Sequence, residues 1–400
     1  MSREVVISGV GVLSACGRGV DALADAVAAR RSACVRDEAL RAIGGRCALA
    51  GPVPGVEEAF ASLGIDAREE RFFGRLSRIG AVAALDALRA SGAAAVGRVL
   101  VATGIGPMGE LAACFRDALT RERHPHPAHA VTRVTPSFLA SYLAALVGAA
   151  RGGHVVSCAC TSSLVALSDA FELIRSGREE ACLVGGVEED SPYGAWAFDR
   201  QRQLSHAATP EGRSRPLSGR AEGFFPAGGA AFFVLEDGQR ARTRGVVPVA
   251  RLAAVSLRSE RAGATLLSLP VRAYQAAITE ARAAAPGELD LVMAHAPPTV
   301  ADPDELAALV EALGPGDAPV RSFKSIFGYT IGASVAIDVA LATWQLAHGR
   351  VLPNDFDAVV GRAEPFAARL LGAAPRPPRR VLKTVYAQGL SAGAAIVEAA

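Results

Sequence analysis

Lysine is nearly absent from this chain of 400 residues, although basic residues as a class are not. The sequence holds 42 lysines and arginines, of which only Lys324 and Lys383 are lysines. A GC-rich genome favours arginine codons, and this bias accounts for most arginines. Against such a bias, a lysine marks a position where a compact ammonium is needed rather than a guanidinium. Lys324 is therefore a candidate functional residue.

Other features that the sequence lacks exclude several classes of protein. The formal net charge is only +2, which gives no electrostatic footprint for nucleic acid or an anionic membrane. No apolar run approaches the ~20 residues that span a bilayer, and the opening "MSREVVISGVGVLSACG" lacks the order of a signal peptide. The seven cysteines have no paired spacing, so they do not form a disulfide framework. We expect a cytoplasmic protein with reduced thiols.

Signatures of cofactors and metals are missing as well. The glycine-rich stretch "TGIGPMGE" has neither the lysine of a phosphate loop nor the spacing of a dinucleotide fingerprint. His124, His126 and His129 stand in a proline-rich stretch without an acidic or thiol partner, so we expect no metal site there. The sequence implies no cofactor and no metal.

What is present is an alternation of short β-type runs and helical stretches rich in alanine and leucine. Runs such as "RVLVATGIG", "EACLVGGVEED", "GGAAFFVLED" and "LDLVMAHAP" are typical of buried strands. Segments such as "RIGAVAALDALRASG" and "SVAIDVALATWQLAHG" have helical spacing and end at glycine. The alternation predicts an α/β fold whose strands are covered on both faces. The polar stretch at 238–248 is the expected connector between two halves.

Three segments share one layout, in which a strand ends at a polar residue and a glycine-punctuated turn or helix follows. The polar residues are Cys160, His295 and Lys324. In α/β sheets, active-site groups collect at such strand ends. Cys160 would lie at the N-terminus of a helix, where the pKa of a thiol is lowered. Cys158 is expected to pack in the layer of Val156. On position alone, Cys160 could still be either a nucleophile or a small apolar filler.

Together the three segments resemble the β-ketoacyl synthases of the thiolase superfamily. "CACTSSLVAL" is similar to that family's T-A-C-S-S-S-L-V-A-L, "HAPPTVADPDE" to its H-G-T-G-T…G-D-x-x-E, and "KSIFGYTIGA" to its K-S-x-x-G-H-x-x-G-A. The resemblance implies a thiolase-like α/β fold, with two similar βαβαβ-type halves in a layered α-β-α-β-α architecture. It implies an N-terminal half at 1–243 that carries the nucleophile, and a C-terminal half at 244–400.

The resemblance also implies roles for individual residues. Cys160 stands at the nucleophile, His295 at the first catalytic histidine and Lys324 at the family's lysine. Asp302 and Glu305 stand at the acidic positions of the loop motif and would support the site.

The departures from the family's motifs fall in or beside the same site. Tyr329 stands where the family has its second histidine, and Gly389 where it has a phenylalanine. The loop after His295 reads Ala-Pro-Pro where the family has Gly-Thr-Gly, and Gly228 replaces a glutamate. We expect Tyr329 to act as a neutral donor in place of an imidazole. Gly389, Leu390 and Thr299 are expected at the substrate or oxyanion site.

Three functions are compatible with this sequence. The first is a β-ketoacyl synthase-like acyltransferase, which takes an acyl group from an acyl carrier protein onto Cys160 and condenses it with a malonyl unit. The second is a non-decarboxylating acyltransferase that passes the group to an amine, hydroxyl or thiol. The third is a partner subunit that resembles a chain-length factor. The resemblance further implies acyl and malonyl thioesters as substrates, and a homodimer or a heterodimer with a second ketosynthase-like subunit.

Overall fold

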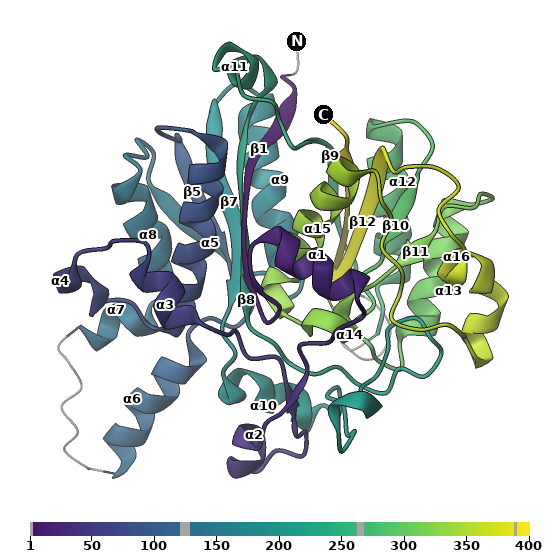
Figure 1. Cartoon of the computed structure of the whole chain (residues 1–400), viewed down its shortest axis with the longest axis horizontal. Coiled ribbons are helices and arrows are strands. Elements are labelled where there is room, and N and C mark those ends of the chain that lie inside the picture. The colour runs from purple at the N-terminus through teal and green to yellow at the C-terminus, as the bar shows by residue number, and fades with distance from the viewer. Residues whose placement is uncertain (1–2, 121–128, 262–267, 388–389) are drawn as a thin grey trace.

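The computed structural model describes residues 3–120, 129–261, 268–387 and 390–400 (Figure 1). Its strands are β1 Val5–Ser14, β2 Gly17–Arg18, β3 Val35–Arg36, β4 Leu49–Ala50, β5 Arg98–Ala102, β6 Gly153–Val156, β7 Ala181–Glu188, β8 Gly229–Asp237, β9 Ala250–Ser259, β10 Leu291–Met293, β11 Val320–Arg321, β12 Arg380–Ala387 and β13 Ser391–Glu398.

The helices alternate with these strands. They are α1 Val20–Ala28, α2 Ala39–Ala42, α3 Val56–Ala61, α4 Ala67–Glu70, α5 Arg75–Ser91, α6 Met108–Thr120, α7 Ala130–Val134, α8 Ser137–Leu146, α9 Ser162–Arg175, α10 Pro192–Arg200, α11 Gly238–Thr243, α12 Val271–Ala284, α13 Asp302–Leu313, α14 Lys324–Phe327, α15 Ser334–His348 and α16 Ala367–Leu371, with 3₁₀ turns η1 Pro210–Gly212, η2 Ile331–Ala333 and η3 Gly361–Phe366.

The main sheet repeats one topology twice. Its strands follow the order β11-β10-β12-β13-β9-β1-β8-β7-β5-β6, with β2 attached to β1. The N-terminal half contributes β1, β5, β6, β7 and β8, and the C-terminal half contributes β9 to β13. Numbered 1 to 5 along the chain within each half, the strands lie in the order 3-2-4-5-1 from the outer edge inward. In both halves the outer three strands are parallel and the pairs 4–5 and 5–1 are antiparallel. The prediction of two similar halves is confirmed.

The junction of the halves is narrow. β1 and β9 pair antiparallel through only two residue pairs, Val6 with Arg251 and Ile7 with Ala250. The predicted connector begins as the short helix α11, which leads from β8 into β9. We propose residues 1–243 and 244–400 as the two units.

Two helices fill the space between the half-sheets. α9 and α15 contact each other and strands of both halves, and Figure 1 shows them between β7 and β12. α15 is buried on every side from Ser334 to Leu346, which fits its almost continuous apolar sequence. Their side chains belong to the central core, together with Leu100, Val184 and Val385. The middle layer is therefore helical.

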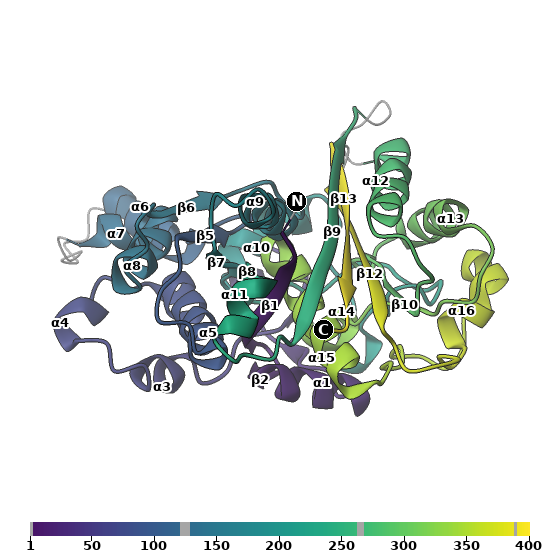
Figure 2. The same ribbon diagram turned by 90° about the horizontal axis from the view of Figure 1, so that it is seen from above.

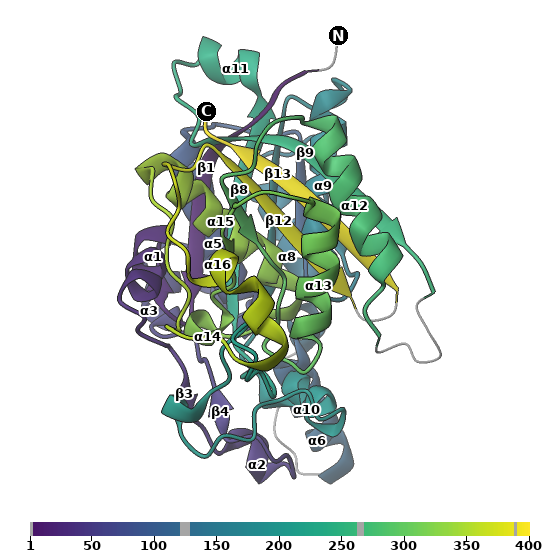
Figure 3. The ribbon, with the colours of Figure 1, turned by 90° about the vertical axis from the view of Figure 1, so that its right-hand side faces the viewer.

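Outer helices complete the layers. α5 and α8 pack on the N-terminal half-sheet, and α12, which α13 contacts in turn, packs on the C-terminal one. Figure 2 shows these groups on opposite sides of the molecule, and Figure 3 shows α12 and α13 in front of β12. Each interface has its own apolar core. The result is the predicted α-β-α-β-α arrangement, and no helix within the described ranges is long and apolar enough to cross a membrane.

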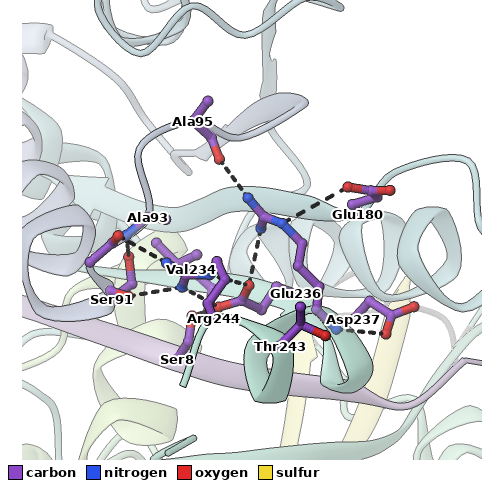
Figure 4. A network of polar contacts seen from close by, with 12 residues as sticks. Ser8, Ser91, Ala93, Ala95, Glu180, Val234, Glu236, Asp237, Thr243 and Arg244 are labelled. Atoms are coloured by element: carbon purple, nitrogen blue, oxygen red, sulfur yellow. Dashed lines mark hydrogen bonds and ion pairs between the residues drawn. The ribbon is translucent and has the colours of Figure 1, made fainter. Parts of the chain in front are cut away.

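A buried carboxylate fastens α11 to the sheet, as Figure 4 shows. Glu236 is fully buried and lies 3.0 Å from Nη1 of Arg240 and 2.9 Å from Nη2 of Arg244. Arg244 also donates to the carbonyl oxygens of Ser91 and Gly92 at the end of α5. One carboxylate thus holds together β8, α11 and the C-terminus of α5.

Candidate active site

Cys160 lies in a strained turn between a strand and a helix. β6 ends at Val156, and α9 begins at Ser162 with Thr161 as its N-cap residue. Ala159, directly before Cys160, has a φ of 51°, a left-handed conformation that is costly for a residue with a Cβ. Backbone N–H to carbonyl bonds from Thr161 to Cys158 and from Ser162 to Ala159 close this turn. The sequence-based placement of Cys160 is confirmed.

The packing prediction for Cys158 is wrong. Its side chain is exposed, whereas Cys160 is partly buried. β6 ends at Val156, two residues before Cys158, so the strand alternation does not extend to Cys158. Cys160 instead contacts apolar side chains of the central core and of a second cluster that includes Ile105, Phe224 and Ile331.

The expected lowering of the Cys160 pKa is also wrong. Burial, with a smaller contribution from the Glu188 carboxylate, raises the pKa of this thiol to about 11. A hydrogen bond with the Tyr329 hydroxyl and the nearby Lys324 ammonium act in the opposite direction, but they are weaker than the desolvation. Cys160 is therefore a protonated thiol at neutral pH, and its activation requires a group that accepts the proton.

Tyr329 connects Cys160 to His295. Its hydroxyl forms a hydrogen bond with the Cys160 thiol and lies 3.3 Å from Nε2 of His295. Both rings are nearly fully buried, at 2% and 1% exposure. Burial raises the pKa of Tyr329 well above its ordinary value, so the hydroxyl stays neutral. The three side chains form one hydrogen-bonded chain.

His295 is a neutral imidazole whose backbone is bound by the Glu305 carboxylate. Burial, followed by the Lys324 and Lys383 ammonium groups, lowers its pKa well below 6.5. The backbone N–H groups of His295 and Ala296 donate to the Glu305 carboxylate at 2.9 and 2.8 Å. Among the described residues, Nδ1 of the ring has no hydrogen-bond partner. Glu305 thus orients the chain at His295 and leaves one ring nitrogen available.

The other loop residues singled out in the sequence fix the loop itself. Asp302 is buried and accepts from the backbone N–H groups of Leu217 and Thr299. The Thr299 hydroxyl accepts from the N–H of Ala301. Burial raises the pKa values of Asp302 and Glu305. Asp302 and Thr299 therefore fix the conformation of the loop, whereas Glu305 contacts the His295 backbone directly.

The two lysines of the chain meet at one carboxylate. Lys324 and Lys383 are both fully buried, and their Nζ atoms lie 3.1 and 2.6 Å from the same oxygen, Oδ2 of Asp338. Asp338 belongs to α15 and was not identified from the sequence. Its signal is a single acidic residue inside a helix that is otherwise apolar all round.

Backbone strain gathers at this site. Six non-glycine residues of the described chain have positive φ, and three of them adjoin the site: Ala159, Ala296 at 28° and Ile331 at 45°. Ala296 occupies the position where the resembled family has glycine, so the departure costs conformational energy. Ile331 is β-branched and follows Tyr329 by two residues, which makes its conformation rarer still.

Glu188 is the last residue of β7, a strand of the N-terminal half. It accepts hydrogen bonds from the Thr103 hydroxyl and from the N–H groups of Gly104 at 2.7 Å and Ile105 at 3.2 Å. Burial nevertheless raises its pKa to about 7. Sequence reasoning gave this residue no role, although it quoted the run that contains it.

The start of β13 approaches the nucleophile turn. The hydroxyls of Thr161 and Ser391 are 3.2 Å apart, which joins the residue after Cys160 to the start of β13. Leu390 is 54% exposed and its N–H donates to the Ala387 carbonyl. Gly389, like His124 and His126, lies outside the described residues.

An apolar hollow opens near the site. It measures about 370 Å³ and lies between α6 and α10, lined by Ile43, Met108, Leu111, Ala112, Phe115, Tyr193 and Trp196. A smaller, neighbouring cavity shares Met108 and is lined by Ile105, Ile331 and Glu188. Ile331 belongs to the apolar cluster against which both Ile105 and Cys160 pack, so the lining of the smaller cavity is continuous with the surroundings of the thiol.

The described part of the chain holds no cluster of histidine, cysteine and acidic side chains that could ligate a metal. His129 packs its ring against Phe72 at 5.4 Å.

The sequence matches the family model of the β-ketoacyl synthase N-terminal domain over residues 2–241 and that of the C-terminal domain over residues 252–355. The chain belongs to the β-ketoacyl synthase family. It is similar to the tetracenomycin polyketide synthase ketoacyl synthase alpha subunit of Streptomyces glaucescens, with 30% identity over 375 residues, 88% of this chain and 87% of that protein.

Solved ketosynthases share the fold. One is the complex of a type II polyketide acyl carrier protein with its ketosynthase bound to the hexaketide, with a TM-score of 0.85 and 22% identity. Another is the ishigamide ketosynthase/chain length factor, with a TM-score of 0.86 and 21% identity. Each comparison covers 100% of both chains, so the thiolase-like fold extends over the whole of this ketosynthase.

Proposed function

We propose that this ketosynthase is a condensing enzyme, which loads an acyl group from an acyl carrier protein onto Cys160 and extends it with a malonyl unit. The observation that carries the proposal is the hydrogen-bonded chain from Cys160 through Tyr329 to His295. It supplies a nucleophile, a route for its proton and donors for a developing oxyanion within one buried site.

Acylation begins with a thiol rather than a thiolate. As the Cys160 sulfur attacks the carrier thioester, its proton moves to the Tyr329 oxygen while the tyrosine proton passes to Nε2 of His295. The carbon–sulfur bond to the carrier then breaks, and the leaving thiolate takes the proton. A lasting imidazolium is unfavourable beside the two buried lysines, because their charges lower the His295 pKa. The relay therefore returns to neutral within the half-reaction.

Condensation uses the same groups as donors. Loss of carbon dioxide leaves the electron pair of the broken bond as an enolate on the malonyl thioester. A ring N–H of His295 and the Tyr329 hydroxyl stabilise the enolate oxygen, in a role worth about 10²–10³ in rate per donor. The enolate carbon then attacks the Cys160 thioester, the carbon–sulfur bond breaks and the cysteine takes up one proton.

The apolar hollow between α6 and α10 is the proposed site of the acyl chain. The lining of the hollow supports this assignment, since ligand pockets are lined mainly by hydrophobic and aromatic side chains. Cys160 packs against the same apolar cluster as Ile105 and Ile331, which line the neighbouring cavity. Phe115 and Trp196 at its rim are exposed. This arrangement fits a carrier-bound chain better than a free polar substrate.

We also infer a cytoplasmic protein that pairs with a second copy or a related subunit. β6 lies at the end of the main sheet and pairs, among the described strands, with β5 alone, and such an edge can pair with another strand. The described cysteines are free thiols. A ketosynthase/chain length factor pair is among the structural neighbours, which supports the heterodimer as one form of the assembly.

Intact-protein mass spectrometry tests this function. The chain is incubated with acyl carrier protein thioesters, with and without malonyl carrier, and carbon dioxide is measured in parallel. We expect an adduct that persists in Cys158→Ala and vanishes in Cys160→Ala. Adducts that remain on Cys160→Ala contradict the nucleophile.

The same experiment separates the alternative functions. A stable Cys160 adduct without carbon dioxide release, and with the acyl group passed to an added amine, hydroxyl or thiol, indicates the non-decarboxylating acyltransferase. A chain that neither acylates nor releases carbon dioxide, yet binds a second synthase, indicates the partner subunit. Carbon dioxide release with a product longer by two carbons supports condensation.

A further inference from the structure

We propose that Lys383 is a second functional lysine of this site, a positioning residue that acts on His295 and shares Asp338 with Lys324. The inference rests on the proposed function for its effect on catalysis. Its structural basis is the burial of both lysines of the chain against one carboxylate oxygen.

The position of Lys383 follows from the sheet. It lies on β12 and pairs with Met293 of the parallel strand β10. Met293 precedes His295 by two residues in the sequence. Its Nζ donates to the carbonyl oxygen of Ala294 at 3.1 Å, besides its contact with Asp338. Lys383 therefore holds the residue immediately before His295, while Glu305 holds the N–H groups of His295 and the residue after it.

Stability alone does not explain a lysine here. The side chain is fully buried, and Asp338, its one ion-pair partner among the described residues, already pairs with Lys324. Burying an ammonium whose carboxylate is shared with a second ammonium is unfavourable. An apolar side chain of similar length in such a place often gives equal or greater stability. In a chain with only two lysines among 42 basic residues, the meeting of both at Asp338 indicates a functional ammonium.

The charges around Lys383 predict what it does. Its charged neighbours are Asp338 and Lys324, with Glu305 from α13 and the His295 ring nearby. Burial lowers the pKa of Lys383 to about 8, so it carries its proton at neutral pH and loses it in mildly alkaline solution. While protonated, it adds to the effect of burial and of Lys324 in lowering the His295 pKa, and it adds positive potential where the enolate forms.

The scarcity of lysine makes the test direct. With lysine labelled at its ε-carbon by ¹³C, the whole chain gives two side-chain NMR signals, which Lys383→Met and Lys324→Met assign. We expect the Lys383 signal to titrate near pH 8. The His295 ring signal, labelled with ¹³C at Cε1 and assigned with His295→Gln, should shift at the same midpoint and lose that step in Lys383→Met.

Activity gives the second readout. Lys383→Met should slow carbon dioxide release by at least about tenfold, because one charge within about 12 Å in a medium of effective dielectric constant near 20 contributes at least that factor. Cys160 acylation should change less, and the alkaline limb near pH 8 should disappear from the pH profile. Leu382→Met, on the opposite face of β12, is the matched control, because Leu382 packs in the outer core.

The outcomes separate the two proposals. A His295 signal that does not respond at the Lys383 midpoint overturns the inference, as does carbon dioxide release by Lys383→Met equal to that of the control. If the wild-type chain releases no carbon dioxide, the proposed function fails, and the wild-type NMR titration decides the coupling of Lys383 to His295. If Lys383→Met does not fold, the wild-type NMR titration is again the test of the coupling between Lys383 and His295.

Discussion

Replacement of Tyr329 by phenylalanine tests the center of the proposed mechanism, because it removes one oxygen and keeps the ring. That oxygen hydrogen-bonds with the Cys160 thiol and lies 3.3 Å from Nε2 of His295. Without it, the thiol and the imidazole lose their connection. The ring should stay in place, since it packs against Phe224 with centroids 4.8 Å apart.

The size of the effect follows from the charge on the partner. A hydrogen bond to a charged group contributes about 1.5–3 kcal/mol, which corresponds to about 10- to 150-fold in rate. Burial already raises the Cys160 pKa to about 11, so the loss of the bond that lowers it makes the thiolate still rarer. We expect acylation to slow in this range.

The assay follows the Cys160 adduct by mass spectrometry at timed intervals, and measures carbon dioxide release from malonyl carrier separately. Tyr386→Phe is the matched control, because its ring packs on His295 at 4.8 Å and no hydrogen bond of its hydroxyl is present within the described ranges. If Tyr329→Phe acylates and decarboxylates within twofold of this control, the relay is refuted.

Three further predictions concern stability. The Glu188 pKa is raised from 4.5 to about 7, so its protonated form favours the fold, and this stability, about 3 kcal/mol at most, is lost as pH rises from 5 to 8. Glu188→Gln should show a smaller change in melting temperature over that window, and an equal slope would contradict the assignment. Glu236→Ala should cost about 3–5 kcal/mol in urea unfolding, because it leaves two arginines without their shared carboxylate; a loss below about 1 kcal/mol would show that water replaces it. Ala296→Gly should stabilise by about 1 kcal/mol through relief of its φ of 28°, and a lower melting temperature would disprove this strain.

Much of the fold was readable from the sequence because the strands concerned are simple apolar runs. Those strands and the buried helix α15 appear where their patterns predict them. β12 was missed because Lys383 and Thr384 interrupt its apolar run, although both are fully buried. The two similar halves were predicted only through the family resemblance, because the strand order repeats while the side chains that fill each half do not.

The sequence predicted which residues form the site better than it predicted their pKa values and contacts. Strand ends identified Cys160, His295 and Lys324, because the topology brings such ends together. The thiol's pKa was predicted in the wrong direction, since the apolar cluster that desolvates Cys160 is built from distant segments, such as Ile105 and Phe224. Asp338 and Lys383 were missed for the same reason. Their roles depend on contacts between elements, which a linear pattern does not record.

The strained residues lower the stability of the fold at positions that fix the active-site side chains. Ala159 adjoins Cys160, Ala296 adjoins His295, and Ile331 lies two residues beyond Tyr329. Each left-handed non-glycine residue costs of order 1–3 kcal/mol and persists only where its surroundings fix it. At Ala296 one fixing contact is the bond from its N–H to Glu305, which also holds the N–H of His295. The backbone strain and the buried charges therefore meet at the same point. A substitution that relaxes the loop should raise stability and, because it frees the imidazole from its fixed orientation, slow the reaction.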